Sequence, residues 1–460
     1  MAVKLSMLIP QNPWWKKEYW EKDDHDLRKV DYYLERKDID IQEGKLTVMR
    51  GIRRSGKTVD LKRIIGKLIE SGVENKKILY LSCDRFTRGE VRNIVSDFII
   101  KRGGGYLLLD EVMYMEGWNL LLKELMERGN FTVIATGSNP VQIKDLVERL
   151  PGRGVEGNEY YFNPLSFREF VLALVRLKDK ICDKNLAKAV EAIKSIDAQF
   201  SPIAPQIEDL FPYYEEIERV FYIYLFTGGF PDAISDYLKT QKISEETYEM
   251  LMRVILGTTA KDKKSEEISR VIMEKALSLG PGRTDFISIG KDVDLHHNTV
   301  RDYLGLLENS RVIYILYPWD IGKKRHSIRK QKKIVFQSAL IPAALNIYLR
   351  GGGWEEAQDF VEKNIEWLVE DVIASHIIWT EERPVMREKH SFAGFFYNAR
   401  ECDFVMLKDN SFYGFESKYG KLERAKYPFK TLYLTKDLMD EDAQPTSLFL
   451  FGLEKGLGCI

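Results

Sequence analysis

The stretch "GIRRSGKT", residues 51–58, decides the fold of this chain because it joins an apolar run to a helical one. The preceding "KLTVM", residues 45–49, is typical of a buried strand, and the apolar residues after the loop, from Leu61 to Leu68, repeat at helical spacing. The loop has the spacing G-x-x-x-x-G-K-[ST], in which backbone N–H groups close on phosphate oxygens. The sequence therefore predicts a phosphate-binding loop at the amino terminus of a helix, where the helix dipole favours an anion.

The residues of this loop are the candidates for contact with ATP. The lysine would place a positive charge on the phosphates, and the threonine would reach Mg²⁺. The alternative is a glycine turn that binds no ligand. The expected nucleotide contacts come from Gly51, Arg54, Ser55, Gly56, Lys57 and Thr58.

Two further apolar runs, residues 77–82 ("KILYLS") and 106–111 ("YLLLDE"), are typical of buried parallel strands. The second run ends in Asp110 and Glu111, at the carboxyl edge of the predicted sheet, where phosphates are expected to lie. Asp110 is predicted to hold Mg²⁺ together with Thr58, and Glu111 to orient or deprotonate the attacking water. The alternative is a pair of solvated acids at a strand end.

A fourth apolar run, "FTVIATGSN" at 131–139, predicts another buried strand that ends in small polar residues. Ser138 or Asn139 could sense the γ-phosphate between the two acids and the loop, and Asn139 is the residue to which this role is assigned. The alternative is an ordinary strand end.

A chain of 460 residues is long enough for two to four domains, each with its own core. Residues 166–260 alternate apolar helical stretches with polar breaks such as "SPIAPQ" at 201–206, which is the composition of a small helical lid. The segment "TGGFPD" at 227–232 is interpreted as a turn, with contact to the nucleotide base as the alternative.

Residues 264–318 have the spacing of a helix, a turn and a second helix, which predicts a winged DNA-binding module. Asn298, Thr299 and Arg301 are expected on the leading turns of the recognition helix. Two apolar strands follow, and the basic segment between them would form a wing that contacts phosphates. The alternative is a module that packs only against partner domains. The basic residues expected to crowd the hairpin tip are Lys323, Lys324, Arg325, Arg329, Lys330, Lys332 and Lys333.

Residues 398–420 predict two strands joined by a turn around Asp409 and Asn410. Asp403 lies in the first strand, and Glu416 and Lys418 lie on one face of the second, because side chains alternate along a strand. Two carboxylates that bind Mg²⁺ beside a lysine are what a metal-dependent phosphodiesterase requires. The alternative is a nuclease-like fold kept for structure or for DNA binding.

The chain resembles archaeal and bacterial AAA+ (STAND-like) ATPases that carry a PD-(D/E)XK nuclease-like (DUF4143-type) domain at the carboxyl end. The resemblance covers nearly the whole chain. The motifs that carry it are "NPWW", "GIRRSGKT", "LLLDEV", "ATGSNP", "PLSFREF" at 164–170, "TGGFPDAI" at 227–234 and the acidic cluster near the end. Val59 and Asp60 depart from the family pattern but lie outside the phosphate cradle, and Ser417 stands where relatives have an apolar residue.

The resemblance implies further site residues. A cation near the γ-phosphate is expected from a neighbouring subunit or a lid, with Arg153 as the candidate and Arg149 as the second choice. In the nuclease-like domain Glu370 would be the helix-borne acid of a metal site completed by Asp403 and Glu416. Both arginines could instead be ordinary surface residues.

The expected fold is α/β, built on a P-loop parallel sheet of the ASCE or AAA+ kind. The expected parts are an ATPase core with an N-terminal extension at 1–165, a helical lid at 166–260, a winged helix at 261–336 and a restriction-endonuclease-like α/β domain at 337–460. The 69 basic and 70 acidic residues exclude a uniformly cationic nucleic-acid coat. The four cysteines have no C-x-x-C spacing, which favours a reducing, cytoplasmic setting. No membrane segment is expected.

The function expected from these features is that of an ATPase which couples ATP hydrolysis to an action on DNA, with ATP and Mg²⁺ as ligands and a homo-oligomer as the assembly. Metal-dependent DNA cleavage by the last domain would be a second activity. The alternative is a nucleotide-gated DNA- or protein-binding switch whose nuclease-like domain is catalytically silent.

Overall fold

A computed structural model describes residues 5–34, 36, 39–102, 104–112, 115, 117–128, 131–137, 159–178, 181–196, 207–261, 264–381, 391–398 and 400–453. The chain forms two compact units, one made mainly of residues before Pro164 and the other mainly of residues from Pro164 onward. The finer division into four domains stays a prediction. Within the described ranges, no helix combines the length and the apolar character needed to span a bilayer.

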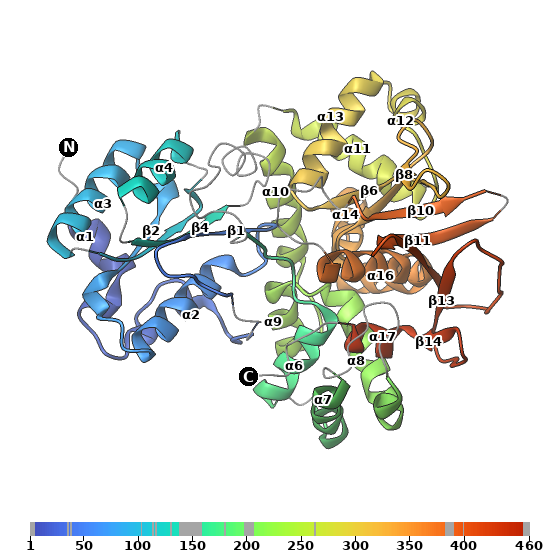
Figure 1. Cartoon of the computed structure of the whole chain (residues 1–460), viewed down its shortest axis with the longest axis horizontal. Helices are drawn as coiled ribbons and strands as arrows, with labels where there is room; N and C mark the ends of the chain where they lie inside the picture. Colours follow the sequence, from blue (N-terminus) through green and yellow to red (C-terminus); the bar gives the residue numbers. More distant parts are fainter. Residues whose placement is uncertain are drawn as a thin grey trace. The chain divides into compact units, whose positions relative to one another are not determined.

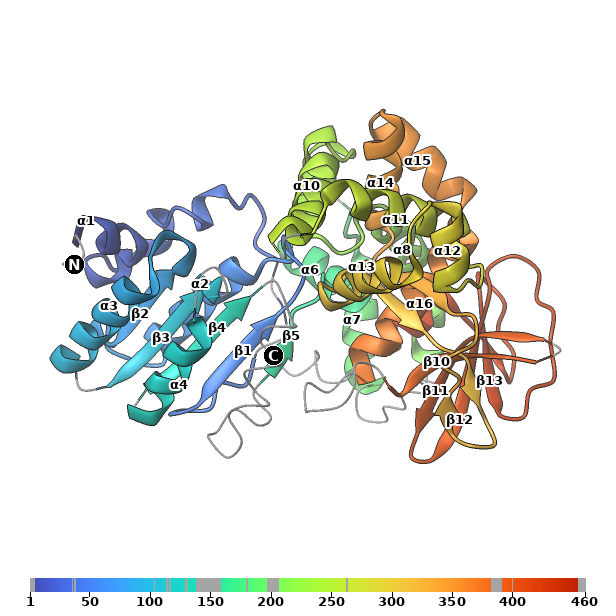
Figure 2. The same ribbon diagram turned by 90° about the horizontal axis from the view of Figure 1, so that it is seen from above.

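The first unit (Figure 1) is built on a five-stranded sheet in the order β2-β3-β4-β1-β5, with every neighbouring pair parallel (Figure 2). This confirms the predicted P-loop α/β fold, in which the strand before the loop lies between two others. The short β5 was not predicted. The strands are β1 (Leu46–Arg50), β2 (Ile78–Ser82), β3 (Gly105–Asp110), β4 (Phe131–Gly137) and β5 (Glu159–Tyr161).

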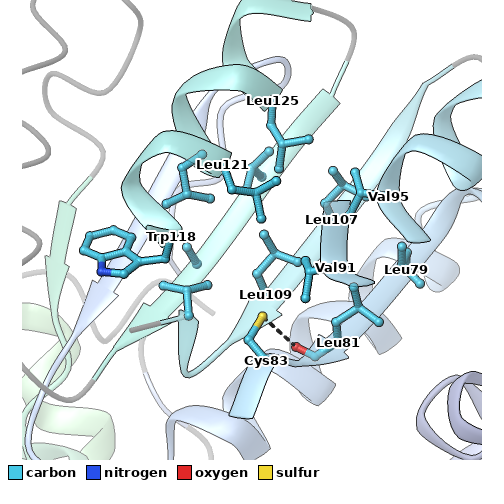
Figure 3. Close-up of a cluster of buried hydrophobic side chains, with 14 of the residues drawn as sticks. Leu79, Leu81, Cys83, Val91, Val95, Leu107, Leu109, Trp118, Leu121 and Leu125 are labelled. Atoms are coloured by element: carbon cyan, nitrogen blue, oxygen red, sulfur yellow. Dashed lines mark hydrogen bonds between the residues drawn. The ribbon is translucent and has the colours of Figure 1, made fainter. Parts of the chain in front are cut away.

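Helices cover both faces of this sheet (Figure 2). On one face, α3 (Arg88–Arg102) and α4 (Trp118–Arg128) pack on leucines and valines of the strands, as Figure 3 shows around Leu109 and Leu121. On the other face, α2 (Lys57–Glu70) packs with Trp14 and Trp20 of the amino-terminal segment. The buried strands thus face apolar side chains on both sides, which explains their nearly continuous apolar sequence.

The amino-terminal segment consists of α1 (Leu5–Leu8) and four short 3₁₀ turns, η1 (Ile9–Gln11), η2 (Pro13–Trp15), η3 (Trp20–Lys22) and η4 (Leu27–Lys29). Further 3₁₀ turns flank β2, at η5 (Asn75–Lys77) and η6 (Cys83–Arg85). The Asn12 side chain donates to the Tyr80 carbonyl (3.0 Å) and accepts from the Tyr80 N–H (2.8 Å). This buried amide pairs with the backbone N–H and carbonyl of Tyr80 on the edge strand β2 and so fixes the segment to the sheet.

The second unit begins with helices, as the sequence predicts for 166–260. They are α6 (Phe167–Leu177), α7 (Lys184–Ile196), η9 (Glu208–Tyr213), α8 (Tyr214–Thr227), α9 (Pro231–Thr240) and α10 (Glu245–Lys261). The motifs "PLSFREF" and "TGGFPDAI" meet here, because the Leu165 N–H donates to the Gly229 carbonyl (2.8 Å). The Tyr224 hydroxyl of α8 also donates to the Leu165 carbonyl (2.7 Å). The "GGFP" segment forms the turn between α8 and α9, so the turn interpretation agrees with the structure.

The next elements are α11 (Glu266–Leu279), α12 (Phe286–Asp292) and α13 (His297–Asn309), followed by the antiparallel pair of β6 (Ile313–Leu316) and β9 (Lys333–Phe336). Between those two strands, β7 (Trp319–Asp320) and β8 (Arg325–His326) form the predicted basic hairpin. The base of the hairpin is fixed to the next sheet, since Trp319 Nε1 donates to the Val405 carbonyl (3.0 Å).

The last part holds a mixed five-stranded sheet in the order β10-β11-β12-β13-β14. The predicted pair of strands is present as antiparallel β11 and β12, and the turn residues Asp409 and Asn410 have φ of 46° and 65°. Helix α16 packs against β12 and β9. The elements are α14 (Leu340–Arg350), α15 (Trp354–Lys363), α16 (Ile365–Glu381), β10 (Ala393–Tyr397), β11 (Glu401–Lys408), β12 (Ser411–Lys418), β13 (Lys430–Thr435), β14 (Ala443–Pro445) and α17 (Thr446–Gly452).

Candidate functional site

The loop between β1 and α2 has the backbone of a phosphate cradle. Gly56 immediately precedes α2 with φ of 98°, a left-handed conformation that favours glycine. A Cβ atom at Gly51 would overlap the carbonyl oxygen of Phe162, so the close approach of these two backbones also requires glycine. The two glycines of the motif are therefore needed for the shape of the loop, which ends at the amino terminus of a 14-residue helix.

Lys57 lies inside this loop, with only 5% of its surface exposed. Its Nζ donates to the carbonyl oxygens of Gly51 and Ile52, both at 2.9 Å, and the Ser55 hydroxyl also donates to the Ile52 carbonyl (2.8 Å). The lysine charge is thus held among backbone dipoles of the loop, beside the first N–H groups of α2. This arrangement fits an anion, because it places a buried positive charge next to the amino terminus of a helix.

Asp110 lies at the carboxyl end of β3 and binds the phosphate loop directly. Its Oδ2 accepts from the Thr58 hydroxyl at 2.7 Å and from the Tyr80 hydroxyl at 3.0 Å, and its Oδ1 accepts from the Thr136 hydroxyl. Burial, followed by the charge of Asp110, raises the pKa of Tyr80, which therefore remains a hydrogen-bond donor. Three strands and α2 hold one carboxylate beside Thr58, as a shared Mg²⁺ site requires.

Glu111 follows Asp110 in a left-handed conformation, with φ of 50°. Its N–H donates to the Thr136 hydroxyl at 3.0 Å, and the same hydroxyl donates to Asp110. Thr136 therefore links the backbone of one acid to the side chain of the other. A non-glycine residue at positive φ is uncommon and is found often at functional sites, where neighbouring contacts hold it.

The structure brings together Lys57, Thr58, Asp110 and Glu111 as predicted. Sequence reasoning missed Tyr80 and Thr136, whose hydroxyls both reach Asp110. Neither carried a signal, because each lies within an apolar strand pattern. The predicted residues Ser138, Asn139, Arg149 and Arg153 lie outside the described residues.

The predicted DNA-binding residues occur on two elements of the second unit. Asn298 and Arg301 are exposed on the first turns of α13, and Thr299 beside them is half-buried. Arg301 lies 3.8 Å from the carboxylate of its neighbour Asp302. These contacts do not test whether the residues bind DNA bases. The assignment of α13 as a recognition helix therefore stays a prediction.

The hairpin of β7 and β8 exposes Lys323, Lys324 and Arg325. Lys324 Nζ donates to the backbone and side-chain oxygens of Asn410, at 2.9 and 2.8 Å. The expectation that Lys332 and Lys333 belong to this tip is wrong, because their exposed fractions are 5% and 2%. The backbone of Lys332 pairs with that of Thr284, and Lys333 is the first residue of β9, so both lysines lie inside the unit.

The carboxyl-terminal sheet holds the second predicted set of acids. Asp403 lies on β11, and Glu416 and Lys418 lie on β12 with Lys418 Nζ 2.5 Å from Glu416 Oε2. The other oxygen of Glu416 accepts from the Tyr427 hydroxyl. Burial, followed by the charge of Asp403, raises the pKa of Glu416. Burial works to lower the pKa of Lys418, but its hydrogen bond to Glu416 and the charges of Glu416, Asp403 and Glu370 together raise it.

Glu370, the predicted helix-borne acid, extends from α16 toward the same place, but Lys333 lies between the acids. The Lys333 Nζ is 2.7 Å from Glu370 Oε1 and 3.5 Å from Asp403 Oδ1. Among the described residues, no group of three or more acidic, histidine or cysteine side chains is arranged to hold a metal ion. The acids are therefore brought together as predicted, but as partners of a lysine and not as an open metal site.

Two family models match parts of the chain. Residues 43–171 match the family described as an AAA domain, and residues 218–348 match a domain of unknown function, DUF8612. The first range contains the phosphate loop and the two acids, Asp110 and Glu111, at the carboxyl end of β3. The strand order agrees with this similarity of the first part of the chain to an AAA domain.

Relatives of the chain include an uncharacterized protein of Methanocaldococcus jannaschii, MJ1637, which is 25% identical over 345 residues, or 70% of this chain and 66% of that protein. An uncharacterized protein of Haemophilus influenzae is 25% identical over 308 residues, or 64% of this chain and 68% of that protein. The match therefore spans just under two thirds of the length of the first relative.

Solved structures overlap with this one only in part. The Aeropyrum pernix ORC1 protein in complex with DNA aligns with a TM-score of 0.32 and 12% identity over 66% of this chain and 87% of that one. The Thermotoga maritima RuvB Holliday junction branch migration motor aligns with a TM-score of 0.29 and 14% identity over 59% and 81%.

Proposed function

We propose that this chain is an ATPase of the AAA+ kind that couples ATP binding and hydrolysis to an action on DNA. The observation that carries the proposal is the convergence of a phosphate loop, its buried lysine and an acid held by the loop threonine at one sheet edge. Thr58 and Asp110 share a hydrogen bond of 2.7 Å, although they lie 52 residues apart. Such a meeting of threonine and acid suits the binding of one Mg²⁺ beside phosphates.

Each residue of the site has a specific part in this proposal. The loop N–H groups and Lys57 would hold the phosphates, and Thr58 and Asp110 would hold Mg²⁺, which would neutralise charge on the phosphate oxygens. Glu111 would orient the attacking water and accept its proton. Asn139 and Arg153 keep their predicted roles as γ-phosphate sensor and trans-acting cation, and the homo-oligomer that a trans-acting arginine needs is part of the proposal.

The nucleotide site is tested by changing the cradle and the base separately. Lys57→Ala should abolish ATP binding measured by calorimetry, because it removes the buried charge that the loop directs at the phosphates. Glu111→Gln should keep ATP bound and stop its hydrolysis, since it changes the base and leaves the cradle intact. Lys67→Ala, in the last turn of the same helix, is the matched control and should bind and hydrolyse ATP normally. Normal binding by Lys57→Ala would refute the site.

The DNA part of the proposal is supported by the exposed cations of the hairpin formed by β7 and β8. Replacing Lys323, Lys324 and Arg325 together by Ala should weaken binding to all DNA sequences alike. It should also reduce the salt dependence by about one unit of log–log slope for each phosphate that the variant no longer neutralises. The control is a triple Ala variant of other exposed cations in this unit, Lys242, Arg253 and Lys363. Equal salt slopes in the two triple variants would place the DNA elsewhere.

The second candidate function is a nucleotide-gated DNA- or protein-binding switch with a catalytically silent nuclease-like domain. The position of Lys333 among the acids favours a silent domain over metal-dependent cleavage. The wing and the ATP site are the same in both candidates, so ATP turnover distinguishes them. A switch needs binding and slow turnover only, whereas a remodelling ATPase should turn over faster when DNA is present.

A further inference from the structure

Lys333, the first residue of β9, is buried among the acids of the carboxyl-terminal sheet. Its Nζ lies 2.6 Å from Glu401 Oε1, in addition to the 2.7 Å contact with Glu370 and the 3.5 Å contact with Asp403. The side chain is 2% exposed. Burial works to lower the pKa of Lys333, but the charges of Glu370, Asp403 and Glu401 outweigh it and raise the pKa. The ammonium group therefore stays charged at the centre of three carboxylates.

The acids on β11 have protein partners for both of their oxygens. Glu401 Oε1 contacts Lys333 and its Oε2 lies 2.8 Å from Arg283 Nε. Asp403 Oδ1 faces Lys333 and its Oδ2 accepts from the Ser417 N–H at 3.0 Å. A divalent cation binds carboxylate oxygens at about 2.0–2.6 Å and would have to displace these partners. The ammonium group already supplies the positive charge that such acids require.

Separating Lys333 from the acids is unfavourable because both the lysine and the acids are buried and would lose their opposite charge. An unpaired ammonium in a buried position is strongly unfavourable, and so is a group of buried carboxylates that has lost its cation. The lysine is fixed further by its strand, since Lys333 pairs with Leu316 in β6.

We propose that Lys333 is a tethered counter-ion that takes the position of a divalent cation among Glu370, Glu401 and Asp403, so that this cluster binds no metal in the native protein. The network has a second consequence for the basic hairpin. Because β9 begins at Lys333, shortly after the hairpin strand β8, the lysine fixes the carboxyl end of the basic segment to α16 and β11. The acids thus serve to hold the hairpin in place, and their presence does not indicate cleavage.

The proposal is tested by Mn²⁺ binding to the full-length protein, measured by calorimetry without nucleotide. An Asp110→Asn background removes the metal site of the phosphate loop. In that background we expect no Mn²⁺ binding that depends on Asp403. Adding Lys333→Met to that background should create a site that binds Mn²⁺ at least about tenfold more tightly than the background protein does. The reason is that the substitution frees three carboxylates and keeps the volume of the side chain. Adding Asp403→Asn to that variant should abolish the new site.

Lys408→Met is the matched control, because Lys408 is a half-buried lysine of β11 that pairs with Glu381 at 2.6 Å outside the cluster. It should gain no Mn²⁺ site. The proposal is overturned if the background protein binds Mn²⁺ and Asp403→Asn removes that binding, or if folded Lys333→Met gains no site. If Lys333→Met does not fold, the comparison of the background with its Asp403→Asn variant still decides the question. Neither outcome bears on ATP binding at Lys57, because the Mn²⁺ measurement uses no nucleotide. The proposed function is therefore tested separately.

Discussion

At the scale of single residues, the proposed nucleotide site depends on three hydroxyl groups that donate to the carboxylate of Asp110. Tyr80 and Thr58 donate to the same oxygen of Asp110, and Thr136 donates to the other. When Thr58 turns to Mg²⁺, as the proposed function requires, Tyr80 and Thr136 remain to orient the carboxylate. In the proposed function they are positioning residues, which orient Asp110 and do not contact the reacting atoms.

The first prediction concerns Tyr80→Phe, which removes one of these donors and keeps the ring. The Mg²⁺ concentration that gives half-maximal ATP turnover should rise about tenfold, since a hydrogen bond to a charged group contributes about 1.5–3 kcal/mol. Turnover at saturating Mg²⁺ should change much less. Tyr106→Phe, on the neighbouring strand and away from the acid, is the control. An unchanged Mg²⁺ requirement in Tyr80→Phe would show that Tyr80 does not orient Asp110.

At the scale of elements, buried polar contacts join segments that are distant in the sequence. In the first unit, Lys62 of α2 pairs with Asp24 at 3.0 Å, and their side chains are 1% and 2% exposed. The lysine also lies 3.5 Å from the centre of the Tyr80 ring. Burial, opposed by the charge of Asp24, lowers the pKa of Lys62. This pair fixes the amino-terminal segment to the helix that follows the phosphate loop.

The second prediction is that Asp24→Asn lowers the free energy of unfolding of the first unit by about 3–5 kcal/mol, because a buried lysine would be deprived of the acid with which it forms an ion pair. Urea unfolding followed by tryptophan fluorescence measures the change. The control is the adjacent Asp23→Asn, whose exposed pair with Lys17 at 2.9 Å should be worth at most about 1 kcal/mol. Equal losses in the two variants would contradict the importance of the buried pair.

In the second unit, His376 of α16 joins that helix to the start of α6. Its Nε2 accepts from the Phe167 N–H at 2.9 Å, one of the helix N–H groups that have no partner within the helix. Its Nδ1 lies 2.8 Å from the Val372 carbonyl and donates to it in this arrangement. The ring is thus held in the neutral form, and burial lowers the pKa of His376 from its ordinary value of 6.5 to about 4.

The third prediction follows from the sign of that shift. Because the folded pKa is the lower one, the stabilisation is complete above about pH 6.5 and is lost as the pH falls toward about 4. By about pH 5 the loss should reach about 2 kcal/mol. Urea unfolding of wild type and His376→Gln at about pH 6.5 and about pH 5 measures this loss of stability. The variant should lack this part of the pH dependence. His25→Gln, which changes an exposed histidine, should keep it. Parallel pH profiles for wild type and His376→Gln would refute the role.

At the scale of the whole molecule, the sequence was sufficient for the phosphate loop and for most of its sheet. Four strands were predictable because each is a mostly apolar run that ends in polar or small residues. The three residues of β5 are too short to show a pattern, and its pairing with β1 depends on contacts more than 100 residues apart. Tyr80 and Thr136 could not be assigned, because the hydroxyl of a strand residue acquires a role only when the neighbouring strand brings the acid.

For Lys333, the sequence pattern was present but predicted the wrong environment. In the sequence it closes a run of basic residues, which is the usual pattern of a solvated surface. Its burial depends on acids that lie 37 and 70 residues further along the chain, at Glu370 and Asp403. A local charge pattern cannot reveal such a partner, so the same residues that predicted a metal site gave no indication of the cation among them.

The central claim is that this chain hydrolyses ATP at the Lys57 site in a manner that responds to DNA. The measurement that tests it most directly is steady-state ATP turnover of wild type and Lys57→Ala, without DNA and with duplex, single-stranded and branched DNA. We predict turnover in wild type alone, and a change in its rate with at least one form of DNA. Turnover in wild type no greater than that of Lys57→Ala in every mixture would contradict the claim.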